Sequence, residues 1–250
     1  MATAALIIMV VMVIEMMRIM VGTSGFSYKE WKGSFYPEDL PADHMLAYYS
    51  ERRPAVEINN TFYRMPQETA LAKWAAEVPE SFTFVLKAPQ RITHQKKLTD
   101  CSDDIRHFFE VAEVLGSKLG PVLFQLPPFA RKDAGKLGDF LSILPRDRRI
   151  AFEFRHASWF DEEIYALLRK YGVALCAADT DETADPDALV VATAPWGYAR
   201  LRRTEYPGDM LAAWRRRIEA QPWDEAYVFF KHEDEGKGPV FARQFLDLTP

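Results

Sequence analysis

The chain has 250 residues, of which 48% are hydrophobic, and its formal net charge is −5. This length and composition fit one large folded domain with a sizeable core and exclude a disordered chain. The negative charge does not favour a protein whose whole surface grips nucleic acid, although it leaves room for a local basic patch. The only cysteines are Cys101 and Cys176, without CxxC spacing. That usage excludes a disulfide scaffold or a zinc ribbon and suits a reducing cytoplasm.

Residues 1–17 form an apolar N-terminal extension, which we separate from a single domain over residues 18–250. Met1 to Ile14 carry no charge, but these 14 residues are too few to span a bilayer as a helix. A signal peptide would carry a basic n-region and a small-residue cleavage site, and this segment has neither. We therefore expect a cytoplasmic protein without a membrane partner, and Met17 or Met20 is an alternative start. A membrane-anchoring extension is the competing interpretation.

Strand-like and helix-like segments alternate along the rest of the chain. The predicted strands are 19–22, 55–58, 82–87, 122–126, 150–154, 173–178, 199–201 and 226–230, with 189–192 as a weaker candidate. The predicted helices are 39–50, 67–77, 103–115, 133–143, 160–170, 208–220 and 239–247. This alternation indicates an α/β protein with parallel strands. Because neither GxGxxG nor a P-loop follows the first strand, we predict a single-domain TIM-type β/α barrel of seven or eight parallel strands.

Polar residues gather where the predicted strands end, and loops after the strands of a barrel open on one face. Side chains alternate across a strand, so Glu57 shares a face with Asn59, and Glu153 shares a face with Arg155. We expect these four to point into the barrel mouth. The further candidates for ligand binding are Tyr28, Trp31, Tyr63, His94, Gln125, His156, Asp179 and Arg200, together with Lys87 at the end of the third strand.

Each of these groups has a role that its chemistry suggests. Lys87, Arg155 and Arg200 are suited to hold a phosphate through charge-assisted hydrogen bonds. We expect Glu153 to act as a general base or acid and Lys87 to supply electrostatic stabilisation. The alternative for Glu153 is a purely structural ion pair with Arg155 or Lys87. Tyr28 and Trp31 either stack against a ligand ring or pack inside their own loop.

Several ordered motifs resemble the YecE-like family, also known as domain of unknown function 72. They are Gly22-Thr23-Ser24-Gly25-Phe26 with Trp31 and Phe35-Tyr36-Pro37, Glu57-Ile58-Asn59-Asn60-Thr61-Phe62-Tyr63, Phe84 to Lys87 with Thr93-His94, Leu123-Phe124-Gln125-Leu126-Pro127-Pro128, and Glu153-Phe154-Arg155-His156 with Ser158-Trp159. The resemblance covers about residues 20 to 248. It implies a TIM-type barrel and no established activity.

Two pairs depart from the pattern of that family. Arg202-Arg203 stand where a His-Gly pair is usual, and Lys231-His232 stand where an Asn pair is usual. Both changes add positive charge to the rim of the barrel. A role that depends on the usual residues is therefore not expected at these strand ends.

Three functions compete for the barrel mouth, and none of them calls for an organic cofactor. The first is binding of, or action on, a small anionic partner that carries phosphate. The second is a nucleic-acid-binding module that uses the aromatic residues after the first strand and the basic loop from Lys87 to Lys97. The third is a metal-dependent phosphodiesterase with Glu153, His156, Asp179 and His232 as ligands, although no spacing demands such a site.

Overall fold

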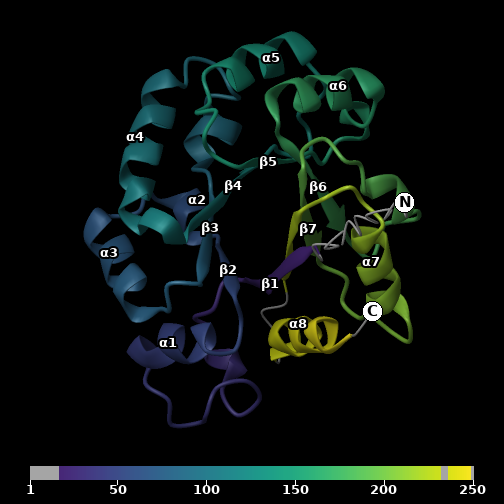
Figure 1. Cartoon of the computed structure of the whole chain (residues 1–250). Coiled ribbons are helices and arrows are strands. Elements are labelled where there is room, and N and C mark those ends of the chain that lie inside the picture. The colour runs from purple at the N-terminus through teal and green to yellow at the C-terminus, as the bar shows by residue number, and fades with distance from the viewer. Residues whose placement is uncertain (1–16, 232–235, 249–250) are drawn as a thin grey trace, which may run out of the picture.

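The computed structural model describes residues 17–231 and 236–248 and shows a closed barrel of parallel strands (Figure 1). The strands pair in the order β1 to β8, and β8 returns to β1. Their bounds are β1 Arg18–Ser24, β2 Ala55–Ile58, β3 Thr83–Lys87, β4 Leu119–Gln125, β5 Ile150–Glu153, β6 Ala174–Asp179, β7 Trp196–Leu201 and β8 Glu225–Phe230. The predicted single-domain TIM-type barrel is confirmed. The predicted N-terminal extension lies outside the described residues, except for Met17.

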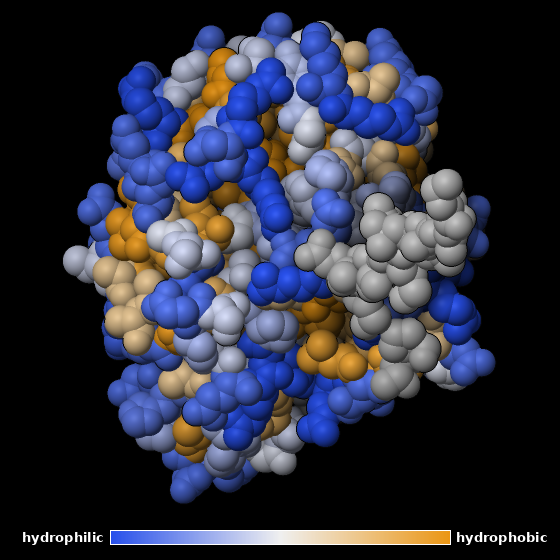
Figure 2. All heavy atoms as spheres, viewed as in Figure 1, coloured by the Kyte–Doolittle hydropathy of each residue, from blue (hydrophilic) through white to orange (hydrophobic). Residues whose placement is uncertain are grey.

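A ring of helices surrounds the strands (Figure 1). The helices are α1 Met45–Ser50, α2 Asn60–Tyr63, α3 Glu68–Glu77, α4 Ser102–Ala112, α5 Ala134–Ser142, α6 Glu162–Tyr171, α7 Met210–Glu219 and α8 Lys237–Asp247. The weaker strand candidate at 189–192 is wrong, because a short 3-10 helix, Asp187–Leu189, and an irregular segment occupy that region. None of the described helices has the length and apolar character needed to cross a membrane. Figure 2 shows one face of the molecule, on which groups of hydrophobic residues are separated by hydrophilic residues.

The two faces of each strand have different surroundings. The outward side chains Val56, Phe84, Phe124 and Phe152 are fully buried in the core beneath the helix ring. The inward side chains Ala55, Val85, Leu123 and Ala151 fill the lower barrel with other apolar groups. Side chains two residues further along a strand share its face. Glu57, Lys87, Gln125 and Glu153 follow these four inward residues by two positions, so they form the next inward layer, above the apolar ones.

The junction between β1 and β2 depends on a buried tyrosine from α1. Tyr49 is fully buried, and its hydroxyl accepts a 2.8 Å hydrogen bond from the Thr23 amide and donates a 3.0 Å hydrogen bond to the Ala55 carbonyl. It thus bridges two backbone groups of neighbouring strands. Gly22 makes this approach feasible, because a Cβ at that position would lie 1.9 Å from the Ala55 carbonyl oxygen. The glycine of the opening motif is therefore explained by packing.

Replacing Tyr49 with phenylalanine should destabilise the fold by about 1–3 kcal/mol, since it leaves a buried amide and a buried carbonyl without their partner. Urea denaturation followed by circular dichroism measures the change. Tyr48→Phe is the matched control, because Tyr48 lies in the same helix and no hydrogen bond of its hydroxyl is found among the described residues. Equal stabilities of the two variants would contradict the bridging role.

Candidate functional site

Charged residues from four strands meet at the carboxyl ends of the barrel. We call Glu57, Lys87, Gln125, Glu153, Arg155, Arg200 and Arg202 the mouth cluster. Its centre is Arg200, which is 1% exposed and donates to Glu153 Oε2 at 2.6 Å and to Glu57 Oε1 at 2.8 Å. Because β2, β5 and β7 are not neighbours in the barrel, Arg200 reaches both carboxylates across the interior.

Glu57 is fully buried and its carboxylate has several donors. Besides Arg200, it accepts hydrogen bonds from Tyr198 at 2.6 Å, Ser24 at 2.7 Å and Asn59 at 3.2 Å. Burial alone would raise the pKa of Glu57, but Arg200 and the hydrogen bonds from Tyr198 and Ser24 hold the pKa below its usual value. Glu57 therefore remains an anion that orients Arg200.

Glu153 lies among three arginines. In addition to Arg200, Arg155 Nε donates to Glu153 Oε1 at 3.2 Å, and Arg202 lies 3.8 Å from the same oxygen. Burial opposes ionisation, but Arg200, Arg202 and Arg155 together hold the pKa of Glu153 well below its usual range. A carboxylate that stays ionised at all physiological pH values is poorly matched to proton transfer. The geometry thus favours the alternative of a structural ion-pair network over our expectation of a general acid or base.

Lys87 is the cation of the cluster without a carboxylate partner. It is 8% exposed, donates to Gln125 Oε1 at 2.9 Å, and lies 4.0 Å from the centre of the Phe62 ring. Among the residues that the structure describes, it forms no ion pair. Burial, and then the charge of Arg200, lowers the pKa of Lys87 to about 8, although Glu57 and Glu153 oppose this change. A fraction of this amine is therefore neutral at physiological pH.

The cluster holds more donors than it can satisfy. Among the described residues of this cluster, four cations, Lys87, Arg155, Arg200 and Arg202, face two carboxylates, Glu57 and Glu153. Gln125 Nε2, Arg200 Nε and Arg202 Nε are buried and have no hydrogen-bond partner in the described part of the chain. All three are donors, and unsatisfied buried donors are costly. The arrangement is therefore suited to a molecule that brings negative charge and acceptor oxygens.

The two histidines of the predicted site lie in loops that follow β3 and β5. His94 Nδ1 lies 2.8 Å from Thr93 Oγ1, and its ring meets Phe62 edge-on. Burial lowers the pKa of His94 most, and the positive charges of Lys87 and Arg155 lower it further. His94 therefore lies near the cations of the mouth. His156 Nδ1 accepts from the Ser158 amide at 3.2 Å. His156 thus helps to fix the loop after β5.

Two predicted ligand-binding residues, Trp31 and Tyr63, do not point into the mouth. Trp31 is 1% exposed and packs against Tyr28, Phe35 and Tyr36, so it belongs to the small core of its own loop. Tyr63 is 73% exposed on α2 and is not a member of the mouth cluster. Neither position therefore supports a role in ligand binding at the mouth. Trp31 does not face the mouth because it packs against the other aromatic residues of its own loop.

Asp179 also lies outside the inward set, which corrects our expectation. It is fully buried and accepts two hydrogen bonds from Arg203 Nε, at 2.8 and 3.0 Å, and one from Trp214 Nε1 at 3.1 Å. Trp214 belongs to α7, so the carboxylate faces the helix ring. Side-chain parity explains this placement, because Cys176 and Ala178 are the inward residues of β6.

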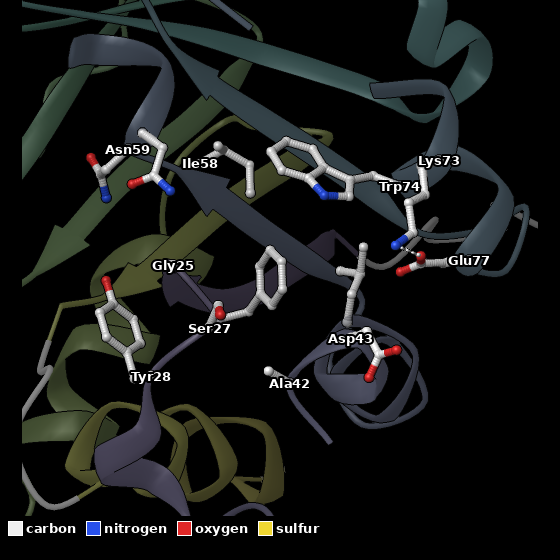
Figure 3. Close-up of a pocket in the computed structure, with 13 residues that line it drawn as sticks. Gly25, Ser27, Tyr28, Ala42, Asp43, Ile58, Asn59, Lys73, Trp74 and Glu77 are labelled. Carbon is white, nitrogen blue, oxygen red and sulfur yellow. Dashed lines mark ion pairs between the residues drawn. The ribbon is translucent and has the colours of Figure 1, made fainter. Parts of the chain in front are cut away.

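A cleft lies beside the mouth, between the loop after β1 and helices α1 and α3. Its volume is about 310 Å³, and its lining includes Tyr28, Asn59, Lys73, Trp74 and Glu77. Figure 3 shows Tyr28 and Asn59 at one end and the Lys73–Glu77 ion pair at the other. Asn59 links the cleft to the mouth cluster, because its amide donates to Glu57. The cleft and the mouth cluster are therefore adjacent at Asn59.

Four residues contribute to the site without having been predicted: Ser24, Phe62, Tyr198 and Arg202. Tyr198 was missed because the predicted seventh strand began at residue 199, whereas β7 begins at Trp196. With the correct start, parity places Tyr198 and Arg200 on one inward face. Arg202 continues that face, and the sequence had indicated it only as a departure from the family pattern.

Glu153 and Asp179, two of the four residues considered as metal ligands, lie on opposite sides of the barrel wall. Glu153 lies inside the barrel with its oxygens bound to arginines, whereas Asp179 faces α7. His232 lies outside the described residues. Within 17–231 and 236–248, no group of three or more His, Cys, Asp or Glu side chains is placed to hold a metal ion.

The basic loop after β3 is neutralised in part by its own neighbours. Arg91 and Lys96 both form ion pairs with Asp104, at 2.7 and 2.6 Å. Asp104 belongs to α4, so these cations brace the loop against the helix ring. They offer less free positive charge to a nucleic-acid backbone than the sequence suggested.

The fold places the chain among the single-domain α/β barrels of the TIM type. The sequence profile described as "Protein of unknown function DUF72" matches residues 20–250. The chain therefore belongs to the DUF72 family. This result confirms the resemblance found in the sequence.

Individual relatives agree with this assignment. UPF0759 protein YunF of Bacillus subtilis (strain 168) is 30% identical over 155 residues, which cover 59% of this chain and 54% of that protein. The match thus spans about half the length of the curated relative. A DUF72 family protein from Thermotoga maritima MSB8 is 28% identical, with a TM-score of 0.79, and the match covers 92% of this chain and 98% of that one.

A second solved structure shows the same fold at lower identity. It is a DUF72 family protein from Enterococcus faecalis V583 with 20% identity and a TM-score of 0.72, and the match covers 94% of this chain and 100% of that one. At this identity the likeness supports the barrel fold alone. The chemistry of the mouth must therefore be argued from the residues of this chain.

Proposed function

We propose that the barrel mouth binds a small anionic molecule that carries a phosphate group. The observation that carries the proposal is the excess of four cations over two carboxylates among the described residues of the cluster, together with donors on Gln125, Arg200 and Arg202 that find no partner there. Arginine and lysine hold phosphate through charge-assisted hydrogen bonds, and an excess of positive charge in a barrel mouth attracts an anionic ligand.

The members of the cluster have different tasks in this proposal. Glu57 and Glu153 hold Arg200 in one orientation and do not exchange protons with the ligand. Arg155 and Arg202 reach the phosphate from the rim, because their side chains are 34% and 17% exposed. Gln125 and Lys87 lie deeper and would meet the end of the ligand opposite the phosphate.

The proposed compartment is the cytoplasm. Cys101 and Cys176 are both free thiols, and both are buried. This state matches a reducing compartment, in which structural disulfides are rare. It also agrees with a phosphorylated metabolite as the partner.

A thermal-shift and calorimetric test compares inorganic phosphate, small phosphorylated metabolites and their uncharged counterparts. A ligand that binds only the folded protein raises the melting temperature. Arg155→Gln and Arg202→Gln should each weaken phosphate binding about tenfold or more, since a hydrogen bond to a charged group contributes about 1.5–3 kcal/mol.

Arg243→Gln is the matched control, because Arg243 is exposed on α8 and pairs only with Asp247 four residues later. It should bind phosphate like the parent. Unchanged affinity in both mouth variants, or no difference between phosphorylated and uncharged ligands, would overturn the proposal.

A further inference from the structure

Lys87 has the surroundings of a reactive amine. A buried lysine whose only task is structural normally pairs with a carboxylate. Lys87 Nζ instead has the amide oxygen of Gln125 at 2.9 Å and the face of Phe62 at 4.0 Å. The two carboxylates of the mouth are bound by arginines. The described part of the chain thus keeps an amine at the base of the mouth without a direct ion pair.

The charged groups around the amine are arranged to favour its neutral form. Arg200 on β7 and Arg155 after β5 repel a proton on Nζ, while Glu57 on β2 and Glu153 on β5 attract it. The charge of Lys87 in turn lowers the pKa of His94, which lies in the loop after β3. Burial and the arginines prevail, and the pKa of Lys87 falls to about 8. A neutral amine is the nucleophilic form of lysine.

Gln125 supplies an independent observation. Its Oε1 accepts from Lys87, while its Nε2 is buried without a partner in the described residues. Both atoms are bonded to the same carbon, so the unsatisfied amide donor lies beside Lys87 Nζ. A carbonyl oxygen next to Nζ would accept from this donor, and the donor would polarise the carbonyl bond.

We propose that Lys87 forms a Schiff base with small aldehydes or ketones that carry a phosphate, and this inference rests on the proposed anion site. Nζ attacks the carbonyl carbon, and the proton lost from nitrogen passes to the carbonyl oxygen to give a carbinolamine. The hydroxyl then takes a proton from solvent and leaves as water, so that one carbon–oxygen bond is replaced by a carbon–nitrogen double bond. The arginines hold the phosphate while this exchange occurs.

The test traps the iminium ion by reduction. The full-length protein is incubated at pH 7 with glycolaldehyde phosphate or with glycolaldehyde, each with cyanoborohydride, which delivers hydride to the iminium carbon. Peptide mapping by mass spectrometry locates the secondary amine. At pH 7, an amine of pKa 8 is neutral on the order of a hundred times more often than an ordinary lysine of pKa about 10.4. We therefore expect rapid labelling of Lys87 at low probe concentration.

Lys170 is the internal reference, since it is exposed in the last turn of α6 and does not line the cleft. We expect Lys87 to be labelled at least about tenfold faster than Lys170, faster with the phosphorylated probe, and more slowly when inorganic phosphate competes. Lys87→Arg should retain its fold and lose this label, while Lys170→Arg should keep it. The mapping on the parent protein decides the matter even if Lys87→Arg fails to fold.

The outcomes separate this inference from the anion site. Labelling of exposed lysines with Lys87 unmodified would overturn the Schiff base, and phosphate binding measured by calorimetry would then stand alone. Equal labelling of Lys87 by both probes, with no phosphate binding, would support the amine chemistry and overturn the anion site. A faster reaction with the phosphorylated probe supports both.

Discussion

Replacing Arg200 with methionine should lower the free energy of unfolding at pH 7 by about 3–5 kcal/mol, the cost of breaking a buried ion pair by removing one partner. Arg200 is the one arginine bonded to both Glu57 and Glu153, and both carboxylates are 0% exposed. Methionine keeps much of the volume of the side chain but no charge. Urea denaturation at several pH values measures the effect.

The pH dependence of the variant should be reversed. In the parent, the folded pKa of both carboxyls lies below the unfolded value of about 4.3, so the pair stabilises the fold above that pH. This contribution is lost as the pH falls towards the folded pKa. Without Arg200, Glu57 loses the largest influence that lowers its pKa, so burial should raise its folded pKa and the variant should regain stability as acid protonates this carboxyl.

Two further variants sharpen this experiment. Arg243→Met removes an exposed pair on α8 and should cost about 1 kcal/mol or less. Adding Glu57→Gln and Glu153→Gln to Arg200→Met should recover part of the loss, because neutral amides are cheaper to bury than unpaired carboxylates. A loss of less than about 1 kcal/mol in Arg200→Met would contradict the central place of this residue.

Replacing Asp179 with alanine should destabilise the fold by about 3–5 kcal/mol while leaving phosphate binding unchanged. Its carboxylate accepts from Arg203, Trp214 and Tyr206, at distances from 2.8 to 3.3 Å. Removal takes away the acceptor of the buried Trp214 indole N–H and one of the acceptors of Arg203. The mouth cluster lies on the other side of the barrel wall, so its affinity should stay within about threefold of the parent.

Calorimetric titration at low temperature, where the variant remains folded, separates stability from affinity. Asp179→Asn retains an acceptor and should lose less stability than the alanine variant. Asp187→Ala, which removes an exposed partner of Arg217, should change stability by about 1 kcal/mol or less. A large loss of phosphate affinity at full stability would return Asp179 to the binding site.

The alternation of strands and helices predicted an α/β fold with parallel strands, and the lack of GxGxxG or a P-loop after the first strand favoured a barrel over an open sheet. Local sequence decides these elements, because side-chain period and β-branched or aromatic content are properties of short segments. The alternation of side chains along a strand predicted more than the fold. Ala55 must share a face of its strand with Glu57, and Ala151 must share a face of its strand with Glu153. The inward direction of Glu57, Asn59, Glu153 and Arg155 was therefore predictable before any strand was paired.

Only the tertiary structure could decide which charges meet. Arg200 binds Glu57 and Glu153 because closure of the barrel brings the inward faces of β7, β2 and β5 together, and no spacing along the chain encodes that distance. In the described part of the chain, Lys87 forms no ion pair with a carboxylate, and Asp179 accepts a hydrogen bond from Trp214 of α7. Parity assigns a residue to one side of a strand, but the partner on that side is chosen by packing of distant segments. The sequence thus determined which polar residues form the inward layer, and the tertiary structure determined which of them bind one another.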